Sequence, residues 1–212
     1  MADDVVDDPR KRLSREERRA QLVALGREEV ERVSFDGLST DRVAAAAGIS
    51  RGLLFHYFPR RDDFLVAIAE DAADELLTIL DPDPDLAPVA QLRASLAAYV
   101  DHISTNRTTY LALIRGAAGG KPEMLVVFDR TRGALTDRIL AALDVAPSDA
   151  ARLRAVARGY LAFAEEIAVT WLRDGAGLDR DELLELLELS LLGILEATGV
   201  DLEPLLAGAT DV

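Results

Sequence analysis

The feature that most constrains the fold is the segment 39–61, STDRVAAAAGISRGLLFHYFPRR, in which one glycine separates two short helical patterns. Ser39 or Thr40 can cap the first helix, because a short hydroxyl side chain accepts hydrogen bonds from the unpaired N–H groups of a helix start. Gly48 can take the left-handed conformation that closes this helix, and Ser50 can cap the second. Two helices joined by so short a turn predict a helix-turn-helix.

The second helix, which should end near Tyr57, has a packing side and an exposed side. At 100° per residue, Leu54 and Phe58 point the same way and are expected to pack inward. The rest of its surface carries Arg51, Gly52, Leu53, His56 and Tyr57. Such a surface suits a helix in the major groove of DNA, with glycine allowing close approach of the backbone. The alternative is an ordinary helical hairpin with a solvated polar face.

The same segment contains a dense series of short motifs at fixed spacings. They are Leu38-Ser39-Thr40, Val43-Ala44, Ala47-Gly48-Ile49-Ser50-Arg51-Gly52, Leu54-Phe55-His56-Tyr57-Phe58 and Arg61. With these residues, roughly residues 14–65 resemble the DNA-binding domain of the TetR family of bacterial transcriptional repressors. Two positions differ from the usual pattern. Leu53 stands where members often have Thr, and Pro59-Arg60-Arg61 replaces a Lys-Ser-Lys-like run. The resemblance implies a transcriptional regulator that binds double-stranded DNA.

The exposed side of the helix and the resemblance together predict the residues that contact DNA. They are Thr40, Ser50, Arg51, Gly52, Leu53, Phe55, His56, Tyr57 and Arg61. The resemblance places Thr40, Arg51, Tyr57 and Arg61 at positions that face phosphates. Upstream, residues 10–12 are Arg-Lys-Arg, which could form an arm that reaches the minor groove or a phosphate, or could be a solvated tail.

The distribution of charge agrees with a DNA partner, although the formal net charge is −14. Residues 9–61 contain twelve Arg or Lys against seven Asp or Glu, and residues 1–8 contain four Asp and no base. Residues 62–212 contain twelve bases and twenty-seven acids. A basic segment on an acidic body predicts that one end of the molecule faces a polyanion.

The pattern of apolar residues predicts an all-α fold of about nine helices, since no β-type alternation is present. The expected helices cover about residues 14–33, 39–47, 50–57, 62–79, 89–105, 108–117, 123–143, 149–173 and 179–197. We expect a flexible arm over residues 1–13, a DNA-binding domain over 14–61 and an effector-binding and dimerisation domain over 62–212. The helix that begins near residue 62 should link the last two.

The helices between residues 89 and 173 are expected to enclose a cavity for a small, largely apolar effector, because ligand sites are usually apolar with a few polar anchors. The candidate contacts are Tyr99, His102, Tyr110, Phe128, Tyr160, Phe163 and Trp171. For each of them, plain core packing is the alternative. Glu165 and Glu166 could form a paired-carboxylate or cation site, but a solvated helix face is favoured.

The last long helix, with the sequence LLELLELSLLGILEA, is apolar nearly all round. A helix that is apolar on several faces must be buried on several faces, so we expect it to hold a homodimer through Leu187, Leu191, Gly193 and Ile194. The resemblance implies the same, since TetR-like proteins dimerise through their last two helices. The alternative is a central helix in a monomeric core.

Several classes of function are disfavoured by composition. The absence of cysteine excludes disulfides, thiolate metal sites and cysteine nucleophiles, and two histidines make a histidine metal cluster improbable. We expect no catalytic residues, metal or cofactor, and neither a signal peptide nor a membrane helix, so the protein should be cytoplasmic. The sequence therefore predicts a homodimeric TetR-like repressor, released from an inverted-repeat operator by a small effector. An α-helical enzyme or ligand carrier without DNA binding, and a regulator without a ligand, are the alternatives.

Overall fold

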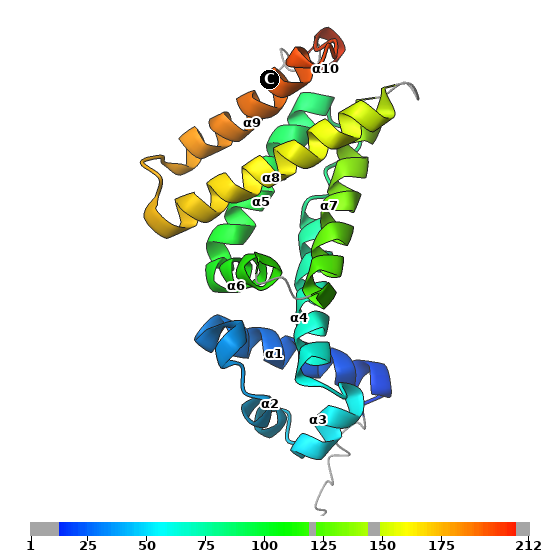
Figure 1. Cartoon of the computed structure of the whole chain (residues 1–212), viewed down its shortest axis with the longest axis vertical. Coiled ribbons are helices and arrows are strands. Elements are labelled where there is room, and N and C mark those ends of the chain that lie inside the picture. The colour runs from blue at the N-terminus through cyan, green and yellow to red at the C-terminus, as the bar shows by residue number, and fades with distance from the viewer. Residues whose placement is uncertain (1–12, 119–121, 144–148, 207–212) are drawn as a thin grey trace, which may run out of the picture.

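The computed structural model describes residues 13–118, 122–143 and 149–206, and the regular elements in these ranges are all helices (Figure 1). The helices are α1 (Arg15–Gly37), α2 (Thr40–Ala46), α3 (Arg51–Tyr57), α4 (Arg61–Ile79), α5 (Pro88–Thr105), α6 (Arg107–Ala118), α7 (Pro122–Ala142), α8 (Ala150–Asp174), α9 (Arg180–Ala197) and α10 (Glu203–Leu206). The all-α prediction is confirmed, and each of the nine expected helices is present near its expected range. The short α10 was not predicted.

Helix α1 begins with a capping box. The Ser14 hydroxyl accepts a hydrogen bond from the Glu17 N–H at 3.1 Å, and the Glu17 carboxylate accepts one from the Ser14 N–H at 2.7 Å. The helix kinks at Ser34, whose φ of 73° is not helical. Beyond the kink, Phe35 and Leu38 are buried beneath the corner that leads to α2. The expected helix end near residue 33 is therefore the position of the kink.

The helix-turn-helix forms as its local sequence predicts. The Ser39 hydroxyl caps α2, and the Ser50 hydroxyl caps α3 by accepting a hydrogen bond from the Leu53 N–H at 3.2 Å. Between them, Gly48 has a φ of 66°, a backbone conformation that is easiest for glycine. Leu54 and Phe58 are both buried in the small core of α1–α4, as expected.

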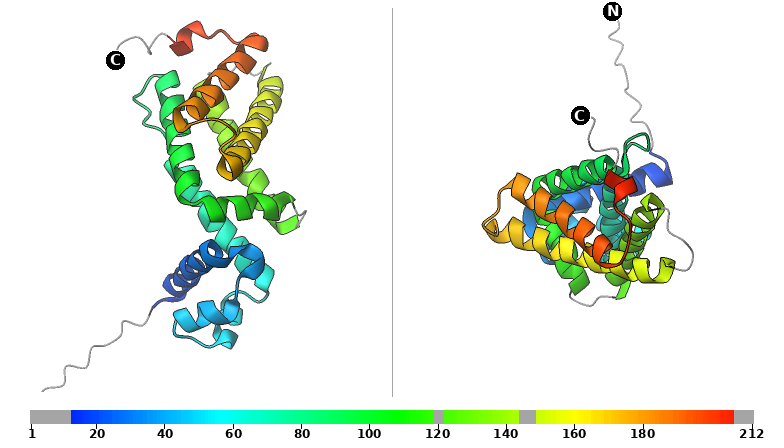
Figure 2. Two further views of the ribbon diagram at one scale, coloured as in Figure 1. Left: turned by 90° about the vertical axis from the view of Figure 1, so that its left-hand side faces the viewer. Right: turned by 90° about the horizontal axis from the view of Figure 1, so that it is seen from above.

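Helix α4 joins the helix-turn-helix to the rest of the molecule. Its Phe64 ring packs on Phe58 with the ring centroids 4.8 Å apart. Helix α1 crosses α4 at Gly26, where a Cβ atom would lie only 2.6 Å from both Phe64 Cζ and Ile68 Cδ1. From this crossing α4 rises into the helical body, where it packs along α7 (Figures 1 and 2). A change in the body can therefore reach the helix-turn-helix through one continuous helix.

Helices α8 and α9 lie side by side on the outside of the body (Figure 1). A stripe of leucines at four-residue spacing on α9 faces inward, and its members Leu183, Leu187, Leu191 and Leu195 are all buried within the subunit. The Tyr160 hydroxyl of α8 reaches across and donates to the Leu187 carbonyl oxygen at 2.9 Å. This stripe forms part of the core that α9 shares with α5 and α8.

The place of Leu187 and Leu191 at a dimer interface stays a prediction. Both side chains are buried within their own subunit, with Leu187 fully inaccessible, which favours other residues of α9 for contact with a second subunit. The remaining apolar groups of α9 face elsewhere: Leu189 is 57% exposed, Gly193 is exposed, and Ile194 is half-buried against the inner cluster. The apolar character all round α9 is thus divided between an inner stripe and an outer surface.

Candidate functional site

The exposed side of α3 lies at the end of the molecule farthest from α9 (Figure 1). Arg51, Gly52, Leu53 and His56 are exposed on this helix, with Ser50 at its start. Two more predicted DNA contacts, Phe55 and Tyr57, are half-buried on its flanks. The structure thus brings seven of the nine predicted residues together on one helix and its cap.

Arg51 is held in place by two weak contacts. Its guanidinium forms an ion pair with Asp41 of α2 at 3.3 Å and lies over the Phe55 ring, 5.3 Å from the centroid. Both charged side chains are more than half exposed to solvent, and exposed ion pairs of this kind contribute little stability. Arg51 can therefore exchange Asp41 for another hydrogen-bond acceptor at small cost.

The other two predicted contacts, Thr40 and Arg61, lie off this helix. Thr40 is the first residue of α2 and only 8% exposed. The Arg61 guanidinium donates to the carbonyl oxygens of Phe35 at 2.8 Å and Leu38 at 3.4 Å. Arg61 therefore ties the start of α4 to the corner between α1 and α2. These hydrogen bonds could not be predicted from the sequence, because their acceptors are backbone atoms more than twenty residues away.

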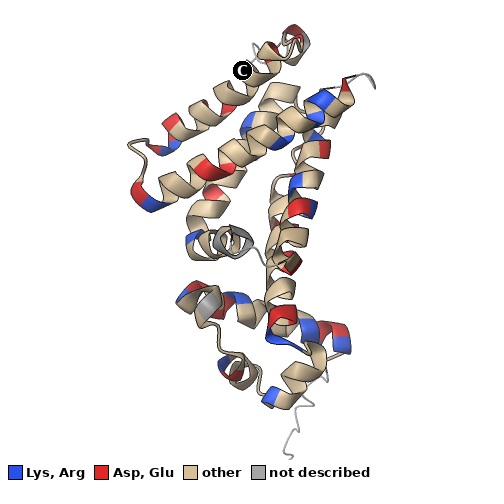
Figure 3. Ribbon diagram, in the orientation of Figure 1, with Lys and Arg blue, Asp and Glu red and all other residues tan. Residues whose placement is uncertain are grey.

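Much of the positive charge near the helix-turn-helix forms ion pairs with acidic residues of α1 and α4. Arg27 pairs with Asp71 and Glu75 of α4, while Arg32 and Arg42 approach the buried Glu29 at 2.8 and 3.3 Å. Figure 3 accordingly shows basic and acidic residues side by side at this end of the described chain. Residues 10–12, which supply three of the expected positive charges, lie outside the described residues.

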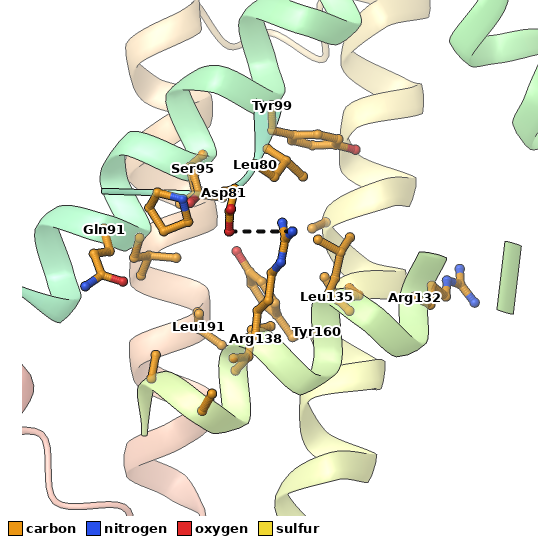
Figure 4. Close-up of a pocket in the computed structure, with 18 of the residues that line it drawn as sticks. Leu80, Asp81, Gln91, Ser95, Tyr99, Arg132, Leu135, Arg138, Tyr160 and Leu191 are labelled. Carbon is orange, nitrogen blue, oxygen red and sulfur yellow. Dashed lines mark ion pairs between the residues drawn. The ribbon is translucent and has the colours of Figure 1, made fainter. Parts of the chain in front are cut away.

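The body contains a partly open cavity of about 580 Å³, which is lined by residues of α4 to α9 and by Leu205 of α10 (Figure 4). Four of the predicted ligand contacts line it: Tyr99, Tyr110, Phe128 and Tyr160. Most of the remaining lining is leucine, isoleucine and alanine, and these residues include Leu76 of α4 and Leu80, which directly follows this helix. The cavity is therefore largely apolar and touches the helix that leads to α3.

The cavity also contains a pair of phenol groups. The hydroxyl oxygens of Tyr99 and Tyr110 are 2.6 Å apart and share a hydrogen bond. Burial raises the pKa of both tyrosines, so both phenols stay neutral at physiological pH. Neutral hydroxyls can donate to or accept from a ligand, whereas the Tyr160 hydroxyl is already used by the Leu187 carbonyl oxygen.

Two ion pairs border the same cavity. Asp81 and Arg138 approach to 3.6 Å, as the dashed line in Figure 4 marks, and Arg132 lies 2.7 Å from Glu165. Burial raises the pKa of the Glu165 carboxyl, while the Arg132 guanidinium opposes this shift. Glu165 is therefore a cavity residue and not part of a solvated face, which is a correction; Glu166 is exposed, as expected.

Three predicted ligand contacts are not in this cavity. His102 lines a separate small cavity of about 90 Å³ together with Arg27 of α1, and burial lowers the pKa of its imidazole. Phe163 packs beside Tyr160 in the cluster between α8 and α9. Trp171 donates its indole N–H to the Leu178 carbonyl oxygen at 3.0 Å and so closes the α8–α9 connection. The side chains of His102, Phe163 and Trp171 thus lie outside the main cavity, and helix periodicity alone could not predict this.

Other classes of site find no support in the described ranges. No group of three or more His, Cys, Asp or Glu residues there has an arrangement that could hold a metal ion. None of the helices between residues 13 and 206 that the structure describes is long and apolar enough to cross a lipid bilayer.

Two segments of the chain match models of known protein families. Residues 22–68 match the family described as "Bacterial regulatory proteins, tetR family", and residues 88–193 match "Tetracyclin repressor-like, C-terminal domain". The crystal structure of a tetR-family transcriptional regulator from Streptomyces coelicolor is 32% identical and superposes with a TM-score of 0.79, covering 92% of this chain and 91% of that one.

Two further relatives are more distant. The HTH-type transcriptional activator FasR of Mycolicibacterium smegmatis is 26% identical over 182 residues, which are 82% of this chain and 81% of FasR. The multidrug binding protein EbrR, solved in complex with proflavin, shares the fold with 21% identity and a TM-score of 0.63, covering 84% of this chain and 99% of that one.

The first family match covers the helix-turn-helix, and the second covers most of the helical body. Members of this family are DNA-binding transcriptional regulators that bind small molecules, and the family is not one of enzymes. The chain therefore belongs to the TetR family of transcriptional regulators.

Proposed function

We propose that the protein is a homodimeric, cytoplasmic repressor that a small, largely apolar effector releases from an inverted-repeat operator. The observation that carries this proposal is the position of α4. Leu76 and Leu80, near its end, line the main cavity, and its first residue, Arg61, follows α3 closely. A ligand that displaces α4 would also move α3, so an effector that prefers the DNA-free spacing of two α3 helices shifts the population away from the operator.

The chemistry of the cavity supports an apolar effector. Its volume of about 580 Å³ and its leucine-rich lining suit a compact lipophilic molecule. Of the charged groups beside it, Asp81 and Arg138 pair with each other, as do Arg132 and Glu165. The hydroxyls of Tyr99 and Tyr110 are then suitable anchors for one or two hydrogen bonds. The EbrR complex with proflavin is a precedent in the same fold for binding a compact aromatic molecule.

The dimer is proposed to form through the outer surfaces of α8 and α9. Leu189 is exposed on α9, and Gly193 one turn further on allows close approach of another helix. On α8, Phe163 and Ile167 are only half-buried in the isolated subunit. Packing these groups against a second copy would cover apolar surface that is otherwise in water.

Whether the bound protein represses or activates depends on the position of the operator relative to the promoter. FasR, a relative of this chain, is described as an activator. A promoter fusion with and without the gene for the protein distinguishes the two: expression that rises when the protein is removed supports repression, and expression that falls shows activation.

Filling the cavity should uncouple effector from operator. A Ser95→Phe variant places a ring in the cavity, whereas Ala94→Phe places the same ring on the exposed side of α5. Compounds from a lipophilic library that weaken operator binding should fail to do so with Ser95→Phe and act normally on Ala94→Phe. For a coupling of about a hundredfold, operator DNA must weaken ligand affinity by the same factor. The affinities can be measured by calorimetry with and without operator.

If Ser95→Phe and the wild type respond equally to every active compound, the effector does not bind in this cavity. If no compound in a broad library changes operator binding, a regulator without a ligand becomes the better description.

The salt dependence of operator binding should show that Arg51 contacts a phosphate and that Arg61 does not. Each phosphate contact contributes roughly 0.9 to the slope of log affinity against log salt. Arg51→Ala removes one such contact from each subunit of the proposed dimer, so it should flatten the slope by roughly 1.8 if Arg51 leaves Asp41 for a phosphate. Arg61→Ala should lower thermal stability, because it loses its bonds to Phe35 and Leu38, and should leave the slope unchanged. Fluorescence anisotropy from low to moderate salt measures both, and a flatter slope for Arg61→Ala would restore it as a phosphate contact.

A further inference from the structure

Leu53 lies in the part of α3 that is best placed to reach base edges. It is in the first turn of the helix, where its N–H donates to the Ser50 hydroxyl. Its neighbour Leu54 is fully buried and fixes the rotation of α3 about its own axis, so that Leu53 is left 40% exposed. In helix-turn-helix proteins, the N-terminal residues of the second helix are the ones that contact bases in the major groove.

A single exposed leucine is ordinary on a protein surface. What distinguishes Leu53 is its position in the first turn of α3 and its wholly apolar side chain. A leucine side chain has no hydrogen-bond donor or acceptor. In the major groove, guanine, adenine and cytosine present donors and acceptors at their edges, while thymine adds a C5-methyl group. Leucine laid over a polar edge would remove water without replacing its hydrogen bonds, at a cost in affinity. Laid over the thymine methyl, it buries apolar surface on both sides.

The neighbourhood of Leu53 allows this approach. A Cβ atom at Gly52 would have only the Ser50 Oγ near it, at 3.9 Å, so the helix surface beside Leu53 is open. Arg51 is drawn aside toward Asp41 and Phe55. His56, one turn along on the same exposed side, supplies the polar group that can read an adjacent base.

We propose that Leu53 is a specificity-determining residue that reads the C5-methyl group of one thymine in each half of the operator. The proposal rests on the proposed function, because it requires two α3 helices on an inverted repeat. The C5-methyl group can be removed without changing base pairing, because uracil is thymine without this methyl group.

The test uses the full-length protein and a duplex selected by it from a random-sequence library. Each thymine of the selected duplex is replaced in turn by uracil, and affinities are measured by fluorescence anisotropy. Loss of one buried methyl should lower wild-type affinity about fourfold at one position per half-site. Replacing both symmetric thymines should lower it about fifteenfold, if the two half-sites act independently.

Variants assign the effect to Leu53. Leu53→Ala should bind thymine and uracil duplexes with nearly equal affinity at that position, and Leu53→Met, which keeps a long apolar side chain, should retain most of the preference. His56→Ala is the matched control on the same face: it should weaken binding but leave the thymine-to-uracil ratio unchanged. At the same position, 5-methylcytosine should bind better than cytosine, because the methyl is restored on another base.

Failure of this inference and failure of the operator proposal give different results. A selected duplex whose every thymine tolerates uracil, or a Leu53→Ala variant that keeps the full preference, would overturn the role of Leu53 alone. A library from which no duplex is enriched would overturn the operator proposal and this inference together.

Discussion

A Leu187→Glu substitution is expected to unfold the helical body of the subunit and not to separate two folded subunits. Leu187 is fully inaccessible in the leucine stripe of α9. A carboxyl group there must take up a proton, which costs about 4 kcal/mol at pH 7 relative to a solvated carboxylate, and the loss of the leucine packing adds about 2–5 kcal/mol. That is comparable with the whole stability of a domain. Circular dichroism on heating should show loss of the cooperative transition or a large fall in Tm.

Leu189→Glu is the matched control, with the same replacement two residues away on the exposed side of α9. Leu189 is 57% exposed, so the variant subunit should keep its helix content. If the proposed dimer uses this surface, light scattering should show a folded monomer with much weaker operator binding. A folded, monomeric Leu187→Glu variant would show instead that the inner stripe faces a second subunit, and a dimeric Leu189→Glu variant would move the interface elsewhere.

A Gly26→Val substitution is expected to disrupt the crossing of α1 and α4. The new Cβ would lie 2.6 Å from the Phe64 ring and the Ile68 side chain, which is closer than packed carbon atoms tolerate. Overpacking of this kind costs about 1–3 kcal/mol. The strain should also shift α1–α3 relative to α4 and so weaken operator binding. Urea unfolding measures the first effect and anisotropy with operator DNA the second.

Two further variants assign the cause to the close contact with Phe64. Phe64→Leu shortens the opposing side chain, so the two substitutions together should cost about 1 kcal/mol less than the sum of their separate effects. Gly133 on α7 has open space around it, and Gly133→Ala should stabilise the protein by up to about 1 kcal/mol through helix propensity. Equal stability of Gly26→Val and wild type would mean that α1 moves away at no cost.

The DNA-binding end could be predicted from sequence because its determinants are local. A cap at Ser50 needs only an N–H three residues further on, and Gly48 needs only the freedom to adopt a positive φ. The inward direction of Leu54 and Phe58 follows from helix periodicity. The many residues of this segment that match the TetR pattern also predicted that it binds DNA.

The body was less predictable, because its helices have more than one apolar face and sequence does not say which face meets which neighbour. Tyr99 and Tyr110 line the cavity as expected, whereas His102 and Trp171 do not, and Glu165 lines it against expectation.

The sequence by itself thus determined the approximate positions of α1 to α9, the helix-turn-helix and the family. Only the tertiary structure decided that Leu187 faces inward, that Gly26 is required at a crossing, and that Arg61 binds backbone carbonyl oxygens of the α1–α2 corner. The physical reason is range. Caps and turns depend on groups within a few residues, while packing joins side chains far apart in the chain, whose meeting depends on the rotation and crossing of whole helices.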